Sequence, residues 1–144
     1  MSKIVIIGAG AMGTAFAFPC ADNNHDVTII GTHLENDFIK NLKNNRNLHP
    51  GLNIIIPSSI NLYKFEKFDE VFKSNVDLIV LGISSKGIEW VAEQIYRIYQ
   101  GKKIPNMLML TKGLSLYQNK YELLVGKLER LFLEKNIKNT NISA

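Results

Sequence analysis

Two patterns of apolar and polar positions alternate along this chain. Short apolar runs of the kind that form buried strands in a parallel sheet are found at residues 3–7, 25–30, 76–83 and 106–111, with a shorter strand predicted near 60–65 and the start of another at 140–143. Apolar residues at helical spacing predict helices over residues 11–23, around 38–42, over 88–98 and over 121–132. Strands that alternate with helices in this way form right-handed βαβ units. The pattern therefore predicts an α/β fold of the Rossmann type, a doubly wound parallel sheet with helices on both faces.

Prolines modify this pattern in two places. Pro19 falls inside the first predicted helix, where a proline removes one backbone hydrogen bond and clashes with the carbonyl four residues earlier. We therefore expect that helix to kink or to end early, near Phe18. Residues 48–62, LHPGLNIIIPSSINL, contain two prolines and a Pro-Gly pair, which predict an ordered connection that leads to the third strand.

The first candidate site lies in residues 3–18, KIVIIGAGAMGTAFAF. The uncharged run is long enough for a membrane helix or a signal segment. However, Gly8, Gly10 and Gly13 have the G-x-G-x-x-G spacing, directly after a β-branched run and before an Ala-rich helix. In such a loop the first glycine allows a tight turn, the second lets a diphosphate approach the backbone, and the third lets helix and strand pack closely. The segment therefore predicts a dinucleotide-binding loop at a helix N-terminus, and no membrane span.

The end of the second predicted strand bears on which cofactor binds. Gly31, Thr32 and His33 stand where dinucleotide-binding folds usually carry an acidic residue that binds the adenosine ribose. No arginine adjoins them to attract a 2′-phosphate. The sequence favours NAD slightly and leaves NADP open, with Thr32 and His33 as expected contacts on this side.

Composition argues against several other functions. A chain of 144 residues that is 46% hydrophobic and 21% charged is typical of one globular domain. Its single cysteine, Cys20, cannot form an intrachain disulfide, which fits a cytoplasmic location. The net charge is +4, but acidic residues are interleaved with the basic ones, so we expect no nucleic-acid partner. The histidines lack partners at metal-ligand spacing, so we expect no metal, and no G-x-S-x-G motif indicates a hydrolase.

Five motifs, in this order, resemble the amino-terminal domain of the NAD-dependent glycerol-3-phosphate dehydrogenase family: GAGAMGTA, HDVTIIG, LHPGLNIIIPSSINL, DLIVLGISS and LTKGL. The resemblance covers the whole chain, residues 1–144. Its most specific part is LTKGL with the preceding GISS, because many dehydrogenases share the glycine loop. It implies hydride transfer between a nicotinamide and the pair glycerol 3-phosphate and dihydroxyacetone phosphate. It also implies that a helical substrate domain follows the cofactor domain, and this chain does not contain one.

The resemblance assigns roles to individual residues. The residues that would line the diphosphate are Gly8, Gly10, Ala11, Met12 and Gly13. Ser84 and Ser85 would lie beside the nicotinamide, and Lys112 would hold or polarise the substrate at the end of its strand. Among the departures from the family pattern, Met12 stands where an aromatic residue is common and Ser84 where proline is common. Either departure could alter cofactor affinity.

Other interpretations remain open. A ketopantoate-reductase-like enzyme would have a similar glycine loop, although LTKGL is not its expected signature. A non-catalytic dinucleotide-binding module is a second alternative, because a fold does not by itself imply an activity. On local grounds alone, Lys112 would more often be a solvated loop lysine. The sequence does not determine the oligomeric state, and a homodimer is left open.

Overall fold

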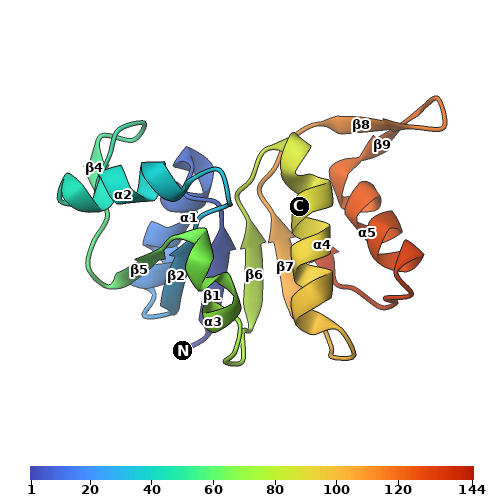
Figure 1. Cartoon of the computed structure of the whole chain (residues 1–144), viewed down its shortest axis with the longest axis horizontal. Coiled ribbons are helices and arrows are strands. Elements are labelled where there is room, and N and C mark those ends of the chain that lie inside the picture. The colour runs from blue at the N-terminus through green and yellow to red at the C-terminus, as the bar shows by residue number, and fades with distance from the viewer.

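The computed structural model describes residues 1–144, and its centre is a six-stranded sheet (Figure 1). The strands are β1 (Lys3–Ile7), β2 (Asp26–Ile30), β5 (Ile60–Tyr63), β6 (Leu78–Leu81), β7 (Asn106–Met109) and β10 (Ile142–Ser143). Their order across the sheet is β5-β2-β1-β6-β7-β10, and every neighbouring pair is parallel. Numbered along the chain, this is the order 3-2-1-4-5-6 of the Rossmann fold. The predicted fold class is therefore confirmed.

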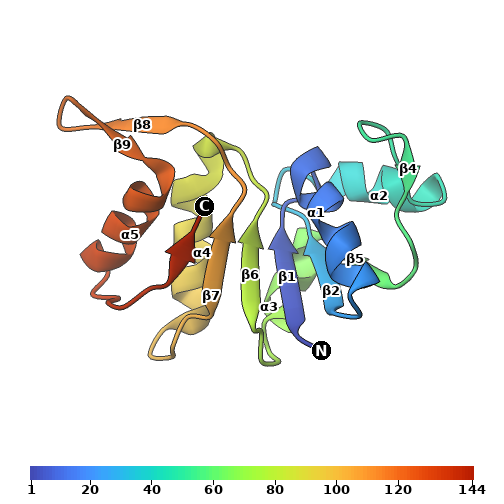
Figure 2. The ribbon, with the colours of Figure 1, turned by 180° about the vertical axis from the view of Figure 1, so that it is seen from behind.

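Helices cover both faces of the sheet. Helices α1 (Ala11–Asp22) and α2 (Asn36–Asn44) pack on one face, and α3 (Phe68–Val71), α4 (Ile88–Tyr99) and α5 (Leu124–Glu134) pack on the other. Figure 1 looks onto the face covered by α3 and α4, and Figure 2 onto the face covered by α1. Short 3-10 turns, η1 (Phe65–Lys67) and η2 (Ser85–Gly87), precede α3 and α4. None of the helices has both the length and the apolar character needed to cross a membrane.

Side chains of the central strands alternate between two apolar cores. In β1, Ile4 and Ile6 belong to the core under α1 and α2, whereas Val5 and Ile7 belong to the core under α3, α4 and α5. Successive side chains of a strand point to opposite faces of the sheet. A strand covered on both sides is therefore apolar at every position, which explains the unbroken run that predicted β1.

Helix α1 continues past Pro19 to Asp22, so the early end predicted near Phe18 is wrong. The proline leaves the carbonyl of Ala15 without its helical donor, but Ala15 and Pro19 both lie on the exposed side of the helix, where water can bind that oxygen. The last turn is closed by Asn23, whose backbone N–H and side-chain amide donate to the Pro19 carbonyl at 3.2 and 2.7 Å. The missing hydrogen bond is tolerated because it faces solvent.

Two β-hairpins interrupt the βαβ pattern. β3 (Leu48–His49) pairs with β4 (Ile54–Ile55) inside the 48–62 connection, and β8 (Leu114–Tyr117) pairs with β9 (Lys120–Leu123). Gln118 and Asn119 join β8 to β9 with φ values of 48° and 59°, as in a two-residue type I′ turn. Tyr121 therefore lies in β9 and not in a helix, which corrects the predicted helix over 121–132, and α5 begins at Leu124.

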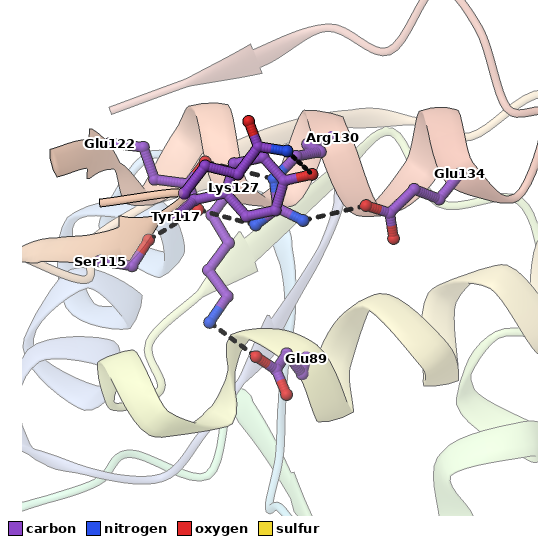
Figure 3. A network of polar contacts seen from close by, with 8 residues as sticks. Glu89, Ser115, Tyr117, Glu122, Lys127, Arg130 and Glu134 are labelled. Atoms are coloured by element: carbon purple, nitrogen blue, oxygen red, sulfur yellow. Dashed lines mark hydrogen bonds and ion pairs between the residues drawn. The ribbon is translucent and has the colours of Figure 1, made fainter. Parts of the chain in front are cut away.

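The β8–β9 hairpin extends from the upper edge of the sheet beside α5 (Figure 1) and has two unlike faces. On its polar face, Arg130 of α5 donates to Glu122 at 2.8 Å and to Glu134 at 3.0 Å, and its guanidinium lies 3.7 Å from the centre of the Tyr117 ring (Figure 3). Hydrogen bonding to Arg130 lowers the pKa of Glu122 below its usual value. The contacts of Arg130 with Glu122 and Tyr117 hold the hairpin against α5. The other face carries exposed apolar side chains, namely Leu114, Leu116, Tyr121 and Leu123.

Candidate functional site

A cleft opens at the carboxyl ends of the parallel strands, where the chain order reverses between β1 and β6. It consists of two adjoining hollows of about 500 and about 470 Å³ that share the lining residues Gly10, Gly82, Ile83 and Ser84. In sheets with this strand order, ligands bind at the same edge and at the same switch point. The fold therefore places a large cavity where the glycine loop predicted one.

Most of the predicted site residues meet in this cleft. Gly10 and Ser84 line both halves. The half beside β7 also contains Ala11, Met12, Ser85 and Lys112. The half beside β2 also contains Thr32 and His33. Residues from four segments that are far apart in sequence are thus brought to one cavity.

The start of helix α1 lies between the two halves. Its N-cap, Gly10, has an extended backbone (φ −68°, ψ 174°), and no side chain caps the helix. The first N–H groups of a helix have no acceptor within the helix, and no acidic residue stands in this first turn. A Cβ added to Gly10 would meet no protein atom within 4 Å. The helix start is therefore open to the cleft and suited to an anion.

Gly8 and Gly13 do not line the cleft but lie beneath it. Gly8 has φ +107°, which disfavours other residues, and an added Cβ would lie 2.5 Å from the Gly82 carbonyl oxygen. A Cβ on Gly13 would lie 2.6 Å from the Gly8 carbonyl oxygen. These glycines let α1 pack against β1 and β6, which is the role predicted for the third glycine, and the positive φ of Gly8 fits the tight turn predicted for the first. Their contact with a diphosphate stays a prediction. Gly82 belongs to the same packing, although no sequence motif indicates it.

Replacing Gly82 by alanine is expected to lower the free energy of unfolding by about 1 to 3 kcal/mol, because the backbone must shift to accept the methyl group. The added Cβ would lie 2.8 Å from the Gly13 Cα. The control is Gly126→Ala, in open space within α5, which should raise the free energy of unfolding by about 0.5 to 1 kcal/mol through helix propensity. Urea unfolding compares the two variants. Equal effects would contradict the close glycine packing.

The loop after β7 brings Lys112 to the mouth of the cleft. Its neighbour Thr111 donates a hydrogen bond from its hydroxyl to the Ile83 carbonyl at 2.7 Å. This bond joins the loop after β7 to the segment after β6, which carries Ser84 and Ser85. Lys112 itself is exposed. Sequence reasoning gave Thr111 no role, because its contact exists only once β6 and β7 lie side by side.

The half of the cleft beside β2 contains residues that the sequence did not single out. The rings of His33 and Trp90, which both line this half, are 4.9 Å apart, and the ring of Phe65, outside the lining, lies 5.5 Å from that of Trp90. Glu35 and Lys86 bring opposite charges to this half. A carboxylate is therefore present, although not at the end of β2, where dinucleotide-binding folds usually carry it.

The strand order, the uncapped helix start and the cleft at the switch point define a Rossmann-type dinucleotide-binding domain. A family model described as NAD-dependent glycerol-3-phosphate dehydrogenase N-terminus matches residues 3–142. The chain belongs to this family, as its motifs predicted.

Individual relatives agree with this assignment. An NADP(+)-dependent glycerol-3-phosphate dehydrogenase from Archaeoglobus fulgidus is 28% identical over 116 residues, which are 81% of this chain and 33% of that protein. A glycerol-3-phosphate dehydrogenase [NAD(P)+] from Bacillus cytotoxicus is 35% identical over 102 residues, which are 70% of this chain and 28% of that protein. The chain thus spans about a third of the length of the curated relatives it matches.

Solved structures resemble the fold. A glycerol-3-phosphate dehydrogenase from Coxiella burnetii superposes with a TM-score of 0.60 at 25% identity, covering 79% of this chain and 33% of that one. A D-mandelate dehydrogenase with NADH and anilino(oxo)acetate gives a TM-score of 0.63 at 24% identity, covering 97% of this chain and 39% of that one. The second likeness is one of fold alone.

Proposed function

We propose that residues 1–144 are the NAD(P)-binding domain of an enzyme that interconverts glycerol 3-phosphate and dihydroxyacetone phosphate. The observation that carries the proposal is the order of groups along the cleft. Ser85 and Lys112 line one half, the uncapped start of α1 lies in the middle, and Thr32 and His33 line the other half. This order matches the nicotinamide, diphosphate and adenosine parts of a dinucleotide. Family membership supports the choice of substrate.

The residues present fit such a cofactor. At the helix start, Gly10 leaves open space, and the N–H groups of Ala11 and Met12 lack acceptors within the helix. These amides would donate to a diphosphate, and the helix dipole adds to the attraction. When bound, the nicotinamide supplies the hydride donor or acceptor. Ser84 and Ser85 would lie beside it.

Lys112 is the proposed catalytic residue. Lys112 lines the half of the cleft beside β7, on a loop that Thr111 holds against the segment after β6. From there it can hold the substrate or donate a hydrogen bond to its carbonyl oxygen, where negative charge develops as the carbonyl is reduced. A cationic donor at that oxygen lowers the barrier to hydride transfer.

Substrate binding is proposed to need a second, helical domain, as the family resemblance implies. The relatives extend well beyond the part that this chain matches. A ketopantoate-reductase-like enzyme and a non-catalytic dinucleotide-binding module are the alternatives. The family match over residues 3–142 favours the dehydrogenase over a ketopantoate-reductase-like enzyme, and the placement of Lys112 in the same half of the cleft as Ser85 favours it over a non-catalytic module.

The proposal also includes a cytoplasmic location, because Cys20 is a free thiol and free thiols are typical of reducing compartments.

A homodimer stays a prediction. Sedimentation velocity on the full chain would test it, and a single species with the mass of one chain at all concentrations would contradict it.

Titration of the purified chain with NADH, followed by nucleotide fluorescence, tests the central proposal. We expect a saturable change with one site per chain. A chain that remains folded and binds neither NADH nor NADPH would contradict the proposed function.

The same titration measures cofactor selectivity. We expect the dissociation constants of NADH and NADPH to differ by less than about tenfold, which corresponds to about 1.4 kcal/mol. Thr32 carries no charge, and Glu35 and Lys86 on this side have opposite charges, so attraction and repulsion of a 2′-phosphate offset each other. Dissociation constants more than about a hundredfold apart would contradict this prediction.

A further inference from the structure

Ala9, at the centre of the glycine turn, has both of its backbone polar groups bound by side chains. Its N–H donates to Glu35 Oε1 at 3.1 Å. Its carbonyl oxygen is bonded to the Thr14 hydroxyl at 3.2 Å and to His49 Nε2 at 3.1 Å. Ala9 is fully buried, at 0% exposure. Three side chains from three segments therefore hold one residue of the loop.

Glu35 joins the two loops that border the β2 half of the cleft. While Oε1 accepts from Ala9, Oε2 accepts from the backbone N–H of Thr32 at 2.7 Å. Glu35 is also the N-cap residue of α2. One carboxylate thus fixes the loop after β1 relative to the loop after β2. Both of its oxygens are used on backbone amides.

His49 holds the glycine turn from below. Its Nδ1 accepts from the Leu52 N–H at 3.2 Å, so the ring hydrogen lies on Nε2, which donates to the Ala9 carbonyl. The side chain is 3% exposed, and its ring lies 5.4 Å from that of Phe38 in an edge-on arrangement. The β3–β4 hairpin, which no pattern predicted, therefore places a fixed donor beneath the loop.

These contacts matter because Ala9 is flanked by glycines. Glycine backbones adopt many conformations at little cost, so the turn between Gly8 and Gly10 would be mobile without anchors. The first residues of α1, Ala11 and Met12, follow directly, and both line the cleft. The orientation of their N–H groups depends on how Ala9 is held.

We infer that Glu35 and His49 are positioning residues that hold Ala9 so that the amides at the start of α1 face the diphosphate. The inference rests on the proposed function. Neither residue needs to touch the diphosphate, since each acts through the backbone of Ala9. Preorganised donors cost no reordering when the ligand binds.

The direction in which Glu35→Gln changes ligand affinity distinguishes this positioning role from a purely electrostatic one. Glu35 carries a negative charge in a cleft proposed to bind an anion. Removing that charge would strengthen binding if charge were its main effect. In Glu35→Gln, however, one of the two backbone N–H groups would face a side-chain NH₂ instead of an acceptor. The positioning role therefore predicts weaker binding, against the electrostatic trend.

The test compares Glu35→Gln with Asp37→Asn by calorimetric titration with NADH and with ADP, which carries the diphosphate without the nicotinamide. Asp37 is an exposed carboxylate in the first turn of α2, so its variant removes the same charge nearby. We expect Glu35→Gln to lose about tenfold or more in affinity for both ligands. We expect Asp37→Asn to bind as tightly as the parent chain, or more tightly.

Equal or tighter binding by Glu35→Gln would overturn the inference. A parent chain that binds neither ligand would instead overturn the proposed function, so the two failures are distinguishable. Urea unfolding of each variant, with titrations performed well below its transition, separates loss of affinity from loss of the fold.

His49 and amide exchange provide independent tests if Glu35→Gln does not fold. His49→Leu removes the donor to Ala9, whereas His49→Gln keeps an N–H donor, so binding should be weakest in the first and partly restored in the second. In the ligand-free parent chain, the Ala9 amide should be protected from hydrogen exchange. Protection that appears only when ADP is added would mean that the ligand, and not Glu35, orders the loop.

Discussion

Replacing Gly10 by valine is expected to weaken NADH binding by more than about a hundredfold, or about 2.8 kcal/mol, and to leave the domain folded. Valine adopts the extended backbone that this residue has, and its Cβ would meet no protein atom within 4 Å. Its methyl groups would instead occupy the cleft in front of the first amides of α1, where the diphosphate is proposed to bind. Calorimetry with NADH measures the loss.

For Gly10→Val, stability and NADH binding are measured separately, so that a loss of affinity is not confused with a loss of the fold. The Gly10→Val variant should unfold in urea within about 0.5 kcal/mol of the parent, as substitutions away from packed features usually do. Gly10→Ala, with a single methyl group, should lose less affinity. A Gly10→Val chain that binds NADH as the parent does would show that the diphosphate is bound elsewhere, and a chain that unfolds would show that Gly10 is structural.

The sequence predicted the elements whose pattern is set by burial on both sides of the sheet. The unbroken run at residues 4–7 is required because β1 lies between two apolar cores. The glycine spacing is equally informative, since Gly8 and Gly13 stand where a side chain would meet backbone atoms. These features depend on strong local constraints. The third strand was located but ends at Tyr63, because boundaries are set by weaker signals.

The two predictions about helix boundaries that the structure contradicts have a different physical origin. Tyr121 stands three residues before Leu124, which is helical spacing, so it was included in the predicted helix. The turn at Gln118 and Asn119 contains no glycine to indicate a hairpin. Pro19 was expected to interrupt α1, but the cost of a lost helical hydrogen bond depends on whether the free carbonyl faces solvent. That orientation is known only once the helix is packed.

The residues of the candidate site likewise fall into those that the sequence indicates and those that only the fold brings together. Gly10 could be singled out from its glycine motif, which lies directly after a strand, and Lys112 from the resemblance of LTKGL to the family. Glu35, His49 and Thr111 act through contacts with residues 26, 40 and 28 positions away in sequence. A single sequence carries no signal for such contacts, and only the sheet order brings their partners together.

The 144-residue chain alone is expected to bind NADH but not to oxidise it measurably with dihydroxyacetone phosphate. Hydride transfer requires the substrate carbonyl to be held about 3 to 3.5 Å from the nicotinamide, and such positioning contributes roughly 7 to 11 kcal/mol to lowering the barrier. Lys112 provides one cation at an open mouth. It cannot by itself exclude water or hold the substrate phosphate. An absorbance assay of NADH at high protein concentration tests this expectation.

The same residues followed by a helical second domain should oxidise NADH in a Lys112-dependent way. Lys112→Ala is expected to reduce the rate by about a hundredfold or more, as removal of a donor to a developing oxyanion does, while NADH affinity changes little. Lys120→Ala is the matched control, because this exposed lysine lies in β9, away from the cleft, and the variant should retain full activity. Turnover by the 144-residue chain that disappears in Lys112→Ala would show that no second domain is needed. Activity of the longer protein that survives Lys112→Ala would remove the role proposed for this lysine.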